Sequence, residues 1–129
     1  MRRSTADASA ASRDAHLTLR RVERQQHLIQ QLYASPHRLT FAQLADDLGV
    51  TERTIARDIE RLRHSGVPIT VTPGRAGGAS IDRTSPTEPV DLDLPEIAAV
   101  MASLAALGPT ASESAASAMH KLATALQRH

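Results

Sequence analysis

The chain has 129 residues, which fits one small domain with appendages and excludes a large multidomain enzyme. Hydrophobic residues make up 41% but aromatic residues only 2%, so the core must consist of Leu, Ile, Val and Ala, which suits a helical protein. The lack of Cys excludes disulfides and thiolate metal sites and fits a reducing cytoplasm. No apolar stretch approaches the ~20 residues of a membrane span and no apolar signal core is present, so we expect a cytoplasmic protein without membrane contact.

Charge is distributed unevenly, although the formal net charge is only +1. Residues 1–75 hold twelve Arg against eight Asp and Glu, a balance of +4, and residues 76–129 hold three basic against six acidic residues, a balance of −3. Fourteen of the fifteen basic residues are Arg, whose guanidinium matches phosphate oxygens or a guanine edge better than an ammonium does. We therefore expect the N-terminal half to face an anion, although a GC-rich genome would favour Arg regardless of function.

Two segments open the chain. We expect residues 1–18 to be a disordered N-terminal arm, because residues 1–15 combine Ser, Ala and charge and cannot bury enough surface to offset the entropy of ordering. Apolar residues then recur at helical spacing and predict a first helix that Pro36 ends: Leu19, Val22, Leu28, Ile29, Leu32 and Tyr33.

Two short helices joined by a tight turn are predicted next. Thr40 opens the first with a capping box to Gln43, and Gly49 at its end tolerates a left-handed conformation. Thr51 is placed to cap the second helix, which runs over residues 52–65 and ends before Gly66. The expected buried residues are Phe41, Leu44, Ala45 and Leu48 in the first helix and Ile55, Ile59 and Leu62 in the second. The expected exposed residues of the second helix are Arg53, Thr54, Arg57, Asp58, Arg61 and Arg63.

The remaining sequence predicts a β-hairpin and two more helices. A β-rich run at 67–72, a Gly-rich turn at 73–78 and a short run at 79–81 form the hairpin, with pairing limited at its start by Pro68. Residues 83–93 are interpreted as a linker, and apolar periodicity over 94–128 predicts a helical hairpin. The fold class is thus mainly α with a small β-hairpin, a winged helix-turn-helix over residues 19–82 followed by a C-terminal helical hairpin.

The two short helices have the parts that a helix-turn-helix needs. In this motif the first helix braces against the DNA backbone and the second inserts its N-terminal side chains into the major groove. Ala45 is small enough for the helices to approach, Gly49 makes the turn, and Ile55 packs the second helix against the first. The caps, the preceding helix and the following hairpin make the match fairly specific.

A family resemblance is carried by residues 40–78, TFAQLADDLGVTERTIARDIERLRHSGVPITVTPGRAGG. They resemble the winged helix-turn-helix of the DeoR-like and WYL-domain transcription regulators, in which T-I-x-R-D-I-x-x-L and a Gly-Gly wing are characteristic, and residues 94–128 resemble more loosely the helical segment that follows the wing in WYL-domain proteins. The Gly-Gly pair is commonly followed there by an aromatic residue and is followed here by Ala79. Relatives continue into a β-rich ligand-sensing domain, whereas this sequence ends at His129, so a regulator lacking that domain and without a small-molecule effector is expected.

The resemblance also implies which residues contact DNA. It places one group of side chains on the groove-facing side of helix 52–65 and Arg75 in the wing, near phosphate or the minor groove. Arg can read guanine or neutralise phosphate, and Thr can hydrogen-bond phosphate or contact a thymine methyl. The predicted DNA-binding residues are Thr40, Thr51, Arg53, Thr54, Arg57 and Arg75.

Other charged residues of helix 52–65 are assigned no direct role in DNA binding. Arg61 and Arg63 are interpreted as a solvated surface. Asp58 is interpreted as structural, because phosphate repels an acid unless an Arg compensates it. Glu52 complements the helix N-terminus rather than reading a base.

Chemistry other than binding has little support. The six His are scattered without metal-ligand spacing, and the Gly-rich run lacks the Gly-Lys-Ser/Thr of a phosphate-binding loop, so no enzyme, cofactor or metal is predicted. The predicted function is a sequence-specific DNA-binding transcription regulator, a repressor, whose partner is double-stranded DNA. The alternative is a winged-helix interaction adaptor that does not bind DNA. Because Ala leaves helix 94–107 apolar on nearly every side, we expect a homodimer through residues 94–128, with a heterodimer with a longer relative as the alternative.

Overall fold

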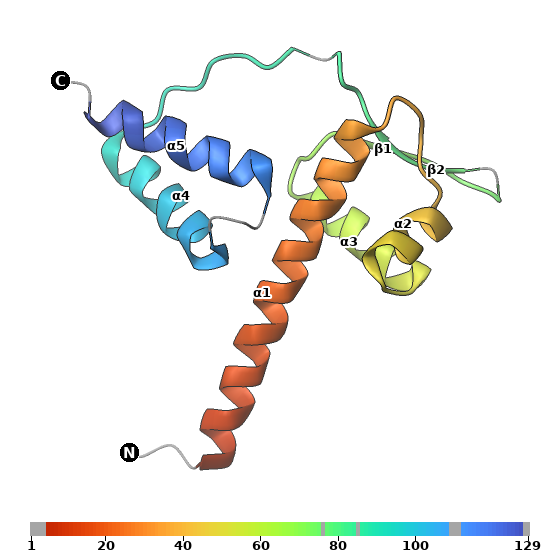
Figure 1. Cartoon of the computed structure of the whole chain (residues 1–129), viewed down its shortest axis with the longest axis horizontal. Helices are drawn as coiled ribbons and strands as arrows, with labels where there is room; N and C mark the ends of the chain where they lie inside the picture. The colour runs from red at the N-terminus through yellow and green to blue at the C-terminus, as the bar shows by residue number, and fades with distance from the viewer. Residues whose placement is uncertain (1–4, 76, 85, 109–111, 128–129) are drawn as a thin grey trace.

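The computed structural model describes residues 5–75, 77–84, 86–108 and 112–127, with the backbone alone for residues 5–12. The described part is mainly α with a two-stranded antiparallel sheet, as predicted, and the elements are arranged as in a winged helix-turn-helix followed by two helices (Figure 1). The helices are α1 Thr5–Ala34, α2 Phe41–Leu48, α3 Glu52–His64, α4 Leu94–Leu107 and α5 Glu113–Gln127, and the strands are β1 Ile69–Thr72 and β2 Gly78–Ile81.

The first helix begins at Thr5, so the predicted disordered arm over residues 1–18 is corrected for its described part, while residues 1–4 lie outside the described residues. Disorder was expected because this segment cannot bury apolar surface. Such burial helps to start a helix, but a helix that has already formed can extend without it. Once a helix is nucleated, each further residue adds one hydrogen bond, and five of the residues from Thr5 to Ala15 are Ala, the best helix former. The side chains of residues 13–20 are exposed, and Figure 1 shows this half of α1 extending away from the other elements.

The local signals around α2 and α3 are confirmed. The Thr40 hydroxyl accepts from the Gln43 N–H at 3.1 Å, and the Gln43 side-chain oxygen accepts from the Thr40 N–H at 2.8 Å, which completes the capping box. Gly49 ends α2 with a φ of 67°, in the left-handed region that costs Gly no Cβ clash. Thr51 caps α3 by accepting from the Thr54 N–H at 3.1 Å.

One apolar core joins the first three helices and the hairpin. The predicted inward face of α3 is buried, and Phe41 and Leu48 of α2 are partly buried against the same cluster. At the other end of the predicted apolar face of α1, Leu19 is 38% exposed, because the elements that cover Leu28 and Leu32 do not reach it. The buried cluster consists of Leu28, Leu32, Leu44, Ala45, Ile55, Ile59, Leu62, Ile69 and Ala79.

A third segment ties the hairpin to the helices. The register pairs Ile69 with Ile81 and Thr72 with Gly78, and Ala79 exchanges two backbone hydrogen bonds with Leu39, at 2.8 and 2.9 Å. A Cβ on Gly78 would lie 2.2 Å from the Leu39 carbonyl oxygen, so only Gly allows this approach. Ala79 is fully buried there, and the segment before α2 therefore lies directly beside β2.

The C-terminal helices pack against the first helix, on the side away from α2 and α3 (Figure 1). The described residues of 82–93 form neither helix nor strand, and Asp93 then opens α4 with a capping box to Glu96. Ser112 donates to the Gln26 side-chain oxygen at 3.2 Å, and Ser114 donates to that of Gln30 at 2.9 Å. These bonds fix the start of α5 on α1.

Candidate nucleic-acid interface

Helix α3 presents a row of Arg on the side away from its buried residues. Arg53 and Arg57 are one turn apart and exposed, and Arg61 follows after a further turn. Together with Ala56 and Glu60 they line one shallow hollow. Two of the predicted DNA-binding residues thus form a single exposed, cationic strip, and a helix of this width fits the major groove.

Two predicted Thr residues lie at the N-terminal end of the same helix. The Thr51 hydroxyl oxygen accepts from the Thr54 N–H and lies 3.0 Å from the Thr54 hydroxyl oxygen. Capping therefore uses an acceptor site of Thr51, and the mutual bond uses one of the two hydroxyl protons. The other proton remains to be donated to an outside acceptor such as a phosphate oxygen.

Thr40 and Arg75 line a second hollow of about 540 Å³, between the starts of α2 and α3 and the hairpin turn. Arg75 is exposed in a turn closed by a hydrogen bond from the Gly77 N–H to the Gly74 carbonyl at 3.0 Å. A helix N-terminus and a nearby guanidinium both favour an anion. Glu52 is the acidic residue in this lining. The six predicted residues thus fall into two groups, one along α3 and one beside the hairpin.

The prediction that Asp58 is exposed is wrong. Its side chain is 0% exposed and points toward α1, where Arg24 Nε donates to one carboxylate oxygen and Arg24 Nη2 donates to the other at 3.1 Å. Gln25 donates to the second oxygen as well, at 3.2 Å. The hydrogen bond to Asp58 is the main cause that raises the pKa of Arg24, against an opposing effect of burial. Asp58 thus joins two helices, and sequence reasoning missed its partners because they lie 33 and 34 residues away.

The two Arg residues left out of the predicted site differ in their surroundings. Arg61 belongs to the row formed with Arg53 and Arg57, and its Nη1 lies 3.8 Å from an Asp58 oxygen. Arg63 instead pairs with Glu60 at 2.9 Å on the surface, an interaction that contributes little stability. Spacing alone could have found Arg61, because Arg53, Arg57 and Arg61 follow one another at intervals of four residues.

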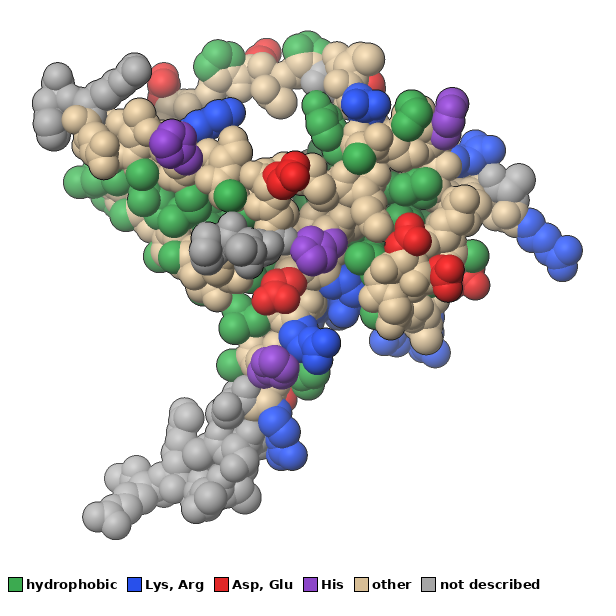
Figure 2. Space-filling view, in the orientation of Figure 1, with side chains coloured by type: hydrophobic (Ala, Val, Ile, Leu, Met, Phe, Trp, Pro, Cys, Tyr) green, Lys and Arg blue, Asp and Glu red, His purple; other side chains and the backbone are tan. Residues whose placement is uncertain are grey.

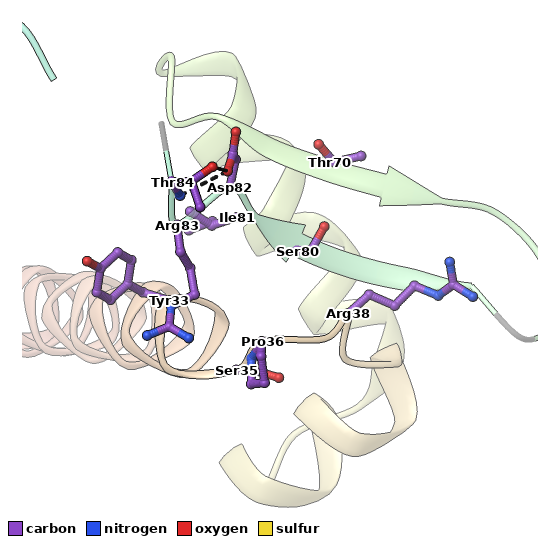
Figure 3. A pocket seen from close by; sticks show the side chains of 10 residues that line it. All are labelled: Tyr33, Ser35, Pro36, Arg38, Thr70, Ser80, Ile81, Asp82, Arg83 and Thr84. Carbon is purple, nitrogen blue, oxygen red and sulfur yellow. Dashed lines mark hydrogen bonds between the residues drawn. The ribbon is translucent and has the colours of Figure 1, made fainter. Parts of the chain in front are cut away.

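A further hollow, of about 650 Å³, lies at the end of α1 and along the outer side of the hairpin (Figure 3). Tyr33 and Arg83 face each other there, with the guanidinium carbon 5.4 Å from the ring centroid. Figure 3 shows Arg38 extending along the sheet toward the end at which β2 begins. Arg38 is exposed and two residues before Thr40, and sequence reasoning assigned it no role.

The part of the chain that the structure describes contains neither a candidate metal site nor a helix that could span a membrane. Among these residues no three His, Cys, Asp or Glu side chains are grouped so that they could hold a metal ion. No helix within the described ranges is long and apolar enough to cross a membrane.

Comparison with known proteins identifies the domain that carries this face. Residues 24–78 match a family model described as "HTH domain", a span that contains α2, α3, both groups of predicted residues and the Arg24–Asp58 pair. No solved structure matches the chain. Residues 24–78 therefore contain a helix-turn-helix domain of the DNA-binding type.

Proposed function

We propose that this DNA-binding domain makes the protein a sequence-specific transcription regulator, a repressor that reads the major groove with α3. The observation that carries the proposal is the exposed row of Arg53 and Arg57 opposite the buried Ile55 and Ile59. A rigid helix, held on its inner side by the core, presents guanidinium groups that match the guanine edge in the major groove.

In this proposal, one group of residues reads the base sequence and another holds the DNA phosphate backbone. Arg57 extends from a helix that is anchored along its inner face, so it is better placed to select a base than a side chain in a flexible turn. Arg75 lies in a Gly-rich turn and lines the same hollow as Thr40. The cation and the helix N-terminus there suit a DNA phosphate, whatever the base sequence. Arg38 adds a cation near the start of β2, and we assign it to the same contact with the DNA phosphate backbone.

Paired substitutions test this division. A preferred site is first selected from random duplexes, and each variant is then titrated with that site and with random duplex over a range of salt. Arg57→Ala should weaken the preferred site by about 1–3 kcal/mol and random duplex much less, which relaxes specificity at one base position. Arg75→Ala should weaken both duplexes nearly equally and reduce the slope of log affinity against log salt by about one.

Arg63→Ala is the matched control, because Arg63 lies on the same helix but pairs with Glu60. It should change neither specificity nor the salt slope by a comparable amount. Equal losses on both duplexes for Arg57→Ala would make Arg57 a phosphate contact and contradict the reading surface. If the unsubstituted protein binds no duplex even at low salt, the adaptor hypothesis replaces the regulator.

We also propose kinship with the DeoR-like and WYL-domain regulators and pairing of two copies through residues 94–128. The first rests on T-I-x-R-D-I-x-x-L at Thr54–Leu62 and on the Gly pair before Ala79. The second rests on α4, in which Ile97 is buried while Val100 is 41% and Leu94 64% exposed. Figure 2 shows hydrophobic side chains gathered over this part of the molecule. A second copy doubles the base contacts and suits palindromic sites.

A further inference from the structure

We infer that Arg24 of α1, through Asp58, is a positioning residue that orients α3 and thereby determines how selectively the protein reads a DNA site. The inference rests on the proposed function, since it concerns the preference for one duplex over another. Arg24 itself need not contact DNA for this role. It acts through a carboxylate next in sequence to Arg57 and three residues before Arg61.

The contact between the two helices is directional. Arg24 donates from two nitrogens to the two oxygens of Asp58, and Gln25 adds a third hydrogen bond from the same turn of α1. Asp58 is fully buried, and the Arg24 side chain is only 22% exposed. A planar fork on a carboxylate accepts a narrow range of angles, so it limits both rotation and sliding of α3.

The apolar contacts of α3 do not impose the same limit. Burial of Ile55, Ile59 and Leu62 is non-directional and holds the helix against the core without a strict angle. Side chains reach about 5–6 Å from a helix axis, so a rotation of about 10° moves their ends by roughly 1 Å. Binding groups need to be held within roughly 0.5 Å, and the Arg24–Asp58 fork therefore supplies the precision that the core lacks.

Energetics also favour orientation over stability as the role of this pair. Replacing both partners of a buried ion pair by apolar residues is often neutral for stability, whereas removing one partner leaves a costly unpaired charge. Asp58 would in addition repel phosphate if it faced the DNA. Arg24 neutralises it on the inner side of the helix, and the half-exposed Arg61 lies 3.8 Å from the same carboxylate.

The deciding experiment removes the fork without leaving a charge unpaired. The double variant Arg24→Met/Asp58→Leu is compared with the unsubstituted protein for its melting temperature and its affinity for the selected site and for random duplex. We expect the melting temperature to stay within a few degrees, random-duplex affinity to change by less than about twofold, and affinity for the selected site to fall at least tenfold. Arg20→Met, an exposed position on the same helix, is the control and should leave the ratio of the two affinities unchanged.

If the double variant does not fold, a second variant tests whether the fork determines selectivity. Arg24→Lys keeps the charge beside Asp58 but loses the planar fork, and it should lower the ratio of specific to random affinity by a smaller factor. An unchanged ratio in a folded variant, or equal losses on both duplexes, would overturn the inference. Failure of the proposed function is distinguishable, because the unsubstituted protein would then prefer no duplex at all.

Discussion

Single residues in this protein are constrained by contacts with segments remote in sequence. Gly78 illustrates this, because the carbonyl of Leu39 occupies the space that a side chain would need. Its backbone does not lie in the left-handed region, so close approach, and not conformational freedom, is what requires Gly. The next residue, Ala79, is fully buried at the same contact.

Gly78→Ala should therefore destabilise the domain. Its Cβ would come within 2.2 Å of the Leu39 oxygen, and relieving this overlap should cost about 1–3 kcal/mol. For a domain of this size that corresponds to a fall in melting temperature of about 4–8 °C per kcal/mol, measured by circular dichroism. Ser80→Ala, on the outer side of the same strand, should stay within about 0.5 kcal/mol. Equal melting temperatures for the two variants would contradict the close approach.

At the scale of the element, each helix depends on a cap or on packing. Thr40→Ala removes the hydroxyl that accepts from the Gln43 N–H and should lower the free energy of unfolding by about 1 kcal/mol, whereas Thr40→Ser should retain most of it. Urea denaturation of both variants checks this. A similar loss in both would mean that the methyl group of Thr40, and not its hydroxyl, stabilises the start of α2.

The first half of α1 should contribute nothing to the stability of the helix-turn-helix. The side chains of residues 13–20 are exposed, and among residues 13–34 of α1 the buried positions are Leu28 and Leu32. Deleting residues 1–16 should therefore change the unfolding free energy by no more than about 0.5 kcal/mol, as measured in urea. A larger loss would show that this half of the helix packs against another part of the protein or a second copy.

For the whole molecule, the proposed dimer predicts a change of mass. Val100→Asp places a charge in the exposed apolar surface of α4 and should convert the dimer into a monomer at tens of micromolar in light scattering, because an unpaired charge is costly to bury. Val90→Asp is the matched control, since Val90 is 76% exposed in the segment before α4, and it should leave the mass unchanged.

Two results would contradict pairing through residues 94–128. One is a monomeric mass for the unsubstituted protein at the same concentration, and the other is a dimer that survives truncation at Thr84. Mixing with a longer relative and measuring the mass again would distinguish the heterodimer from the homodimer.

Much of the fold could be predicted from the sequence, because the signals were local. The capping box at Thr40, the left-handed Gly49 and the cap at Thr51 each involve atoms within a few residues of one another. The buried face of α3 follows from the 3.6-residue period, which any helix imposes on its side chains. The start of α1 was the exception, since extension of a helix needs no apolar face.

The tertiary structure alone decided which of these residues lie together. Asp58 had been expected at the surface, and its burial depends on Arg24 and Gln25, more than thirty residues earlier. Thr40 and Arg75 line the same hollow, and Leu39 pairs with Ala79, only because the hairpin folds back onto the start of α2. Periodicity reports which way a side chain points from its own helix but not which element lies opposite. Those contacts depend on the packing of the whole core, and that packing is what forms the candidate DNA-binding face.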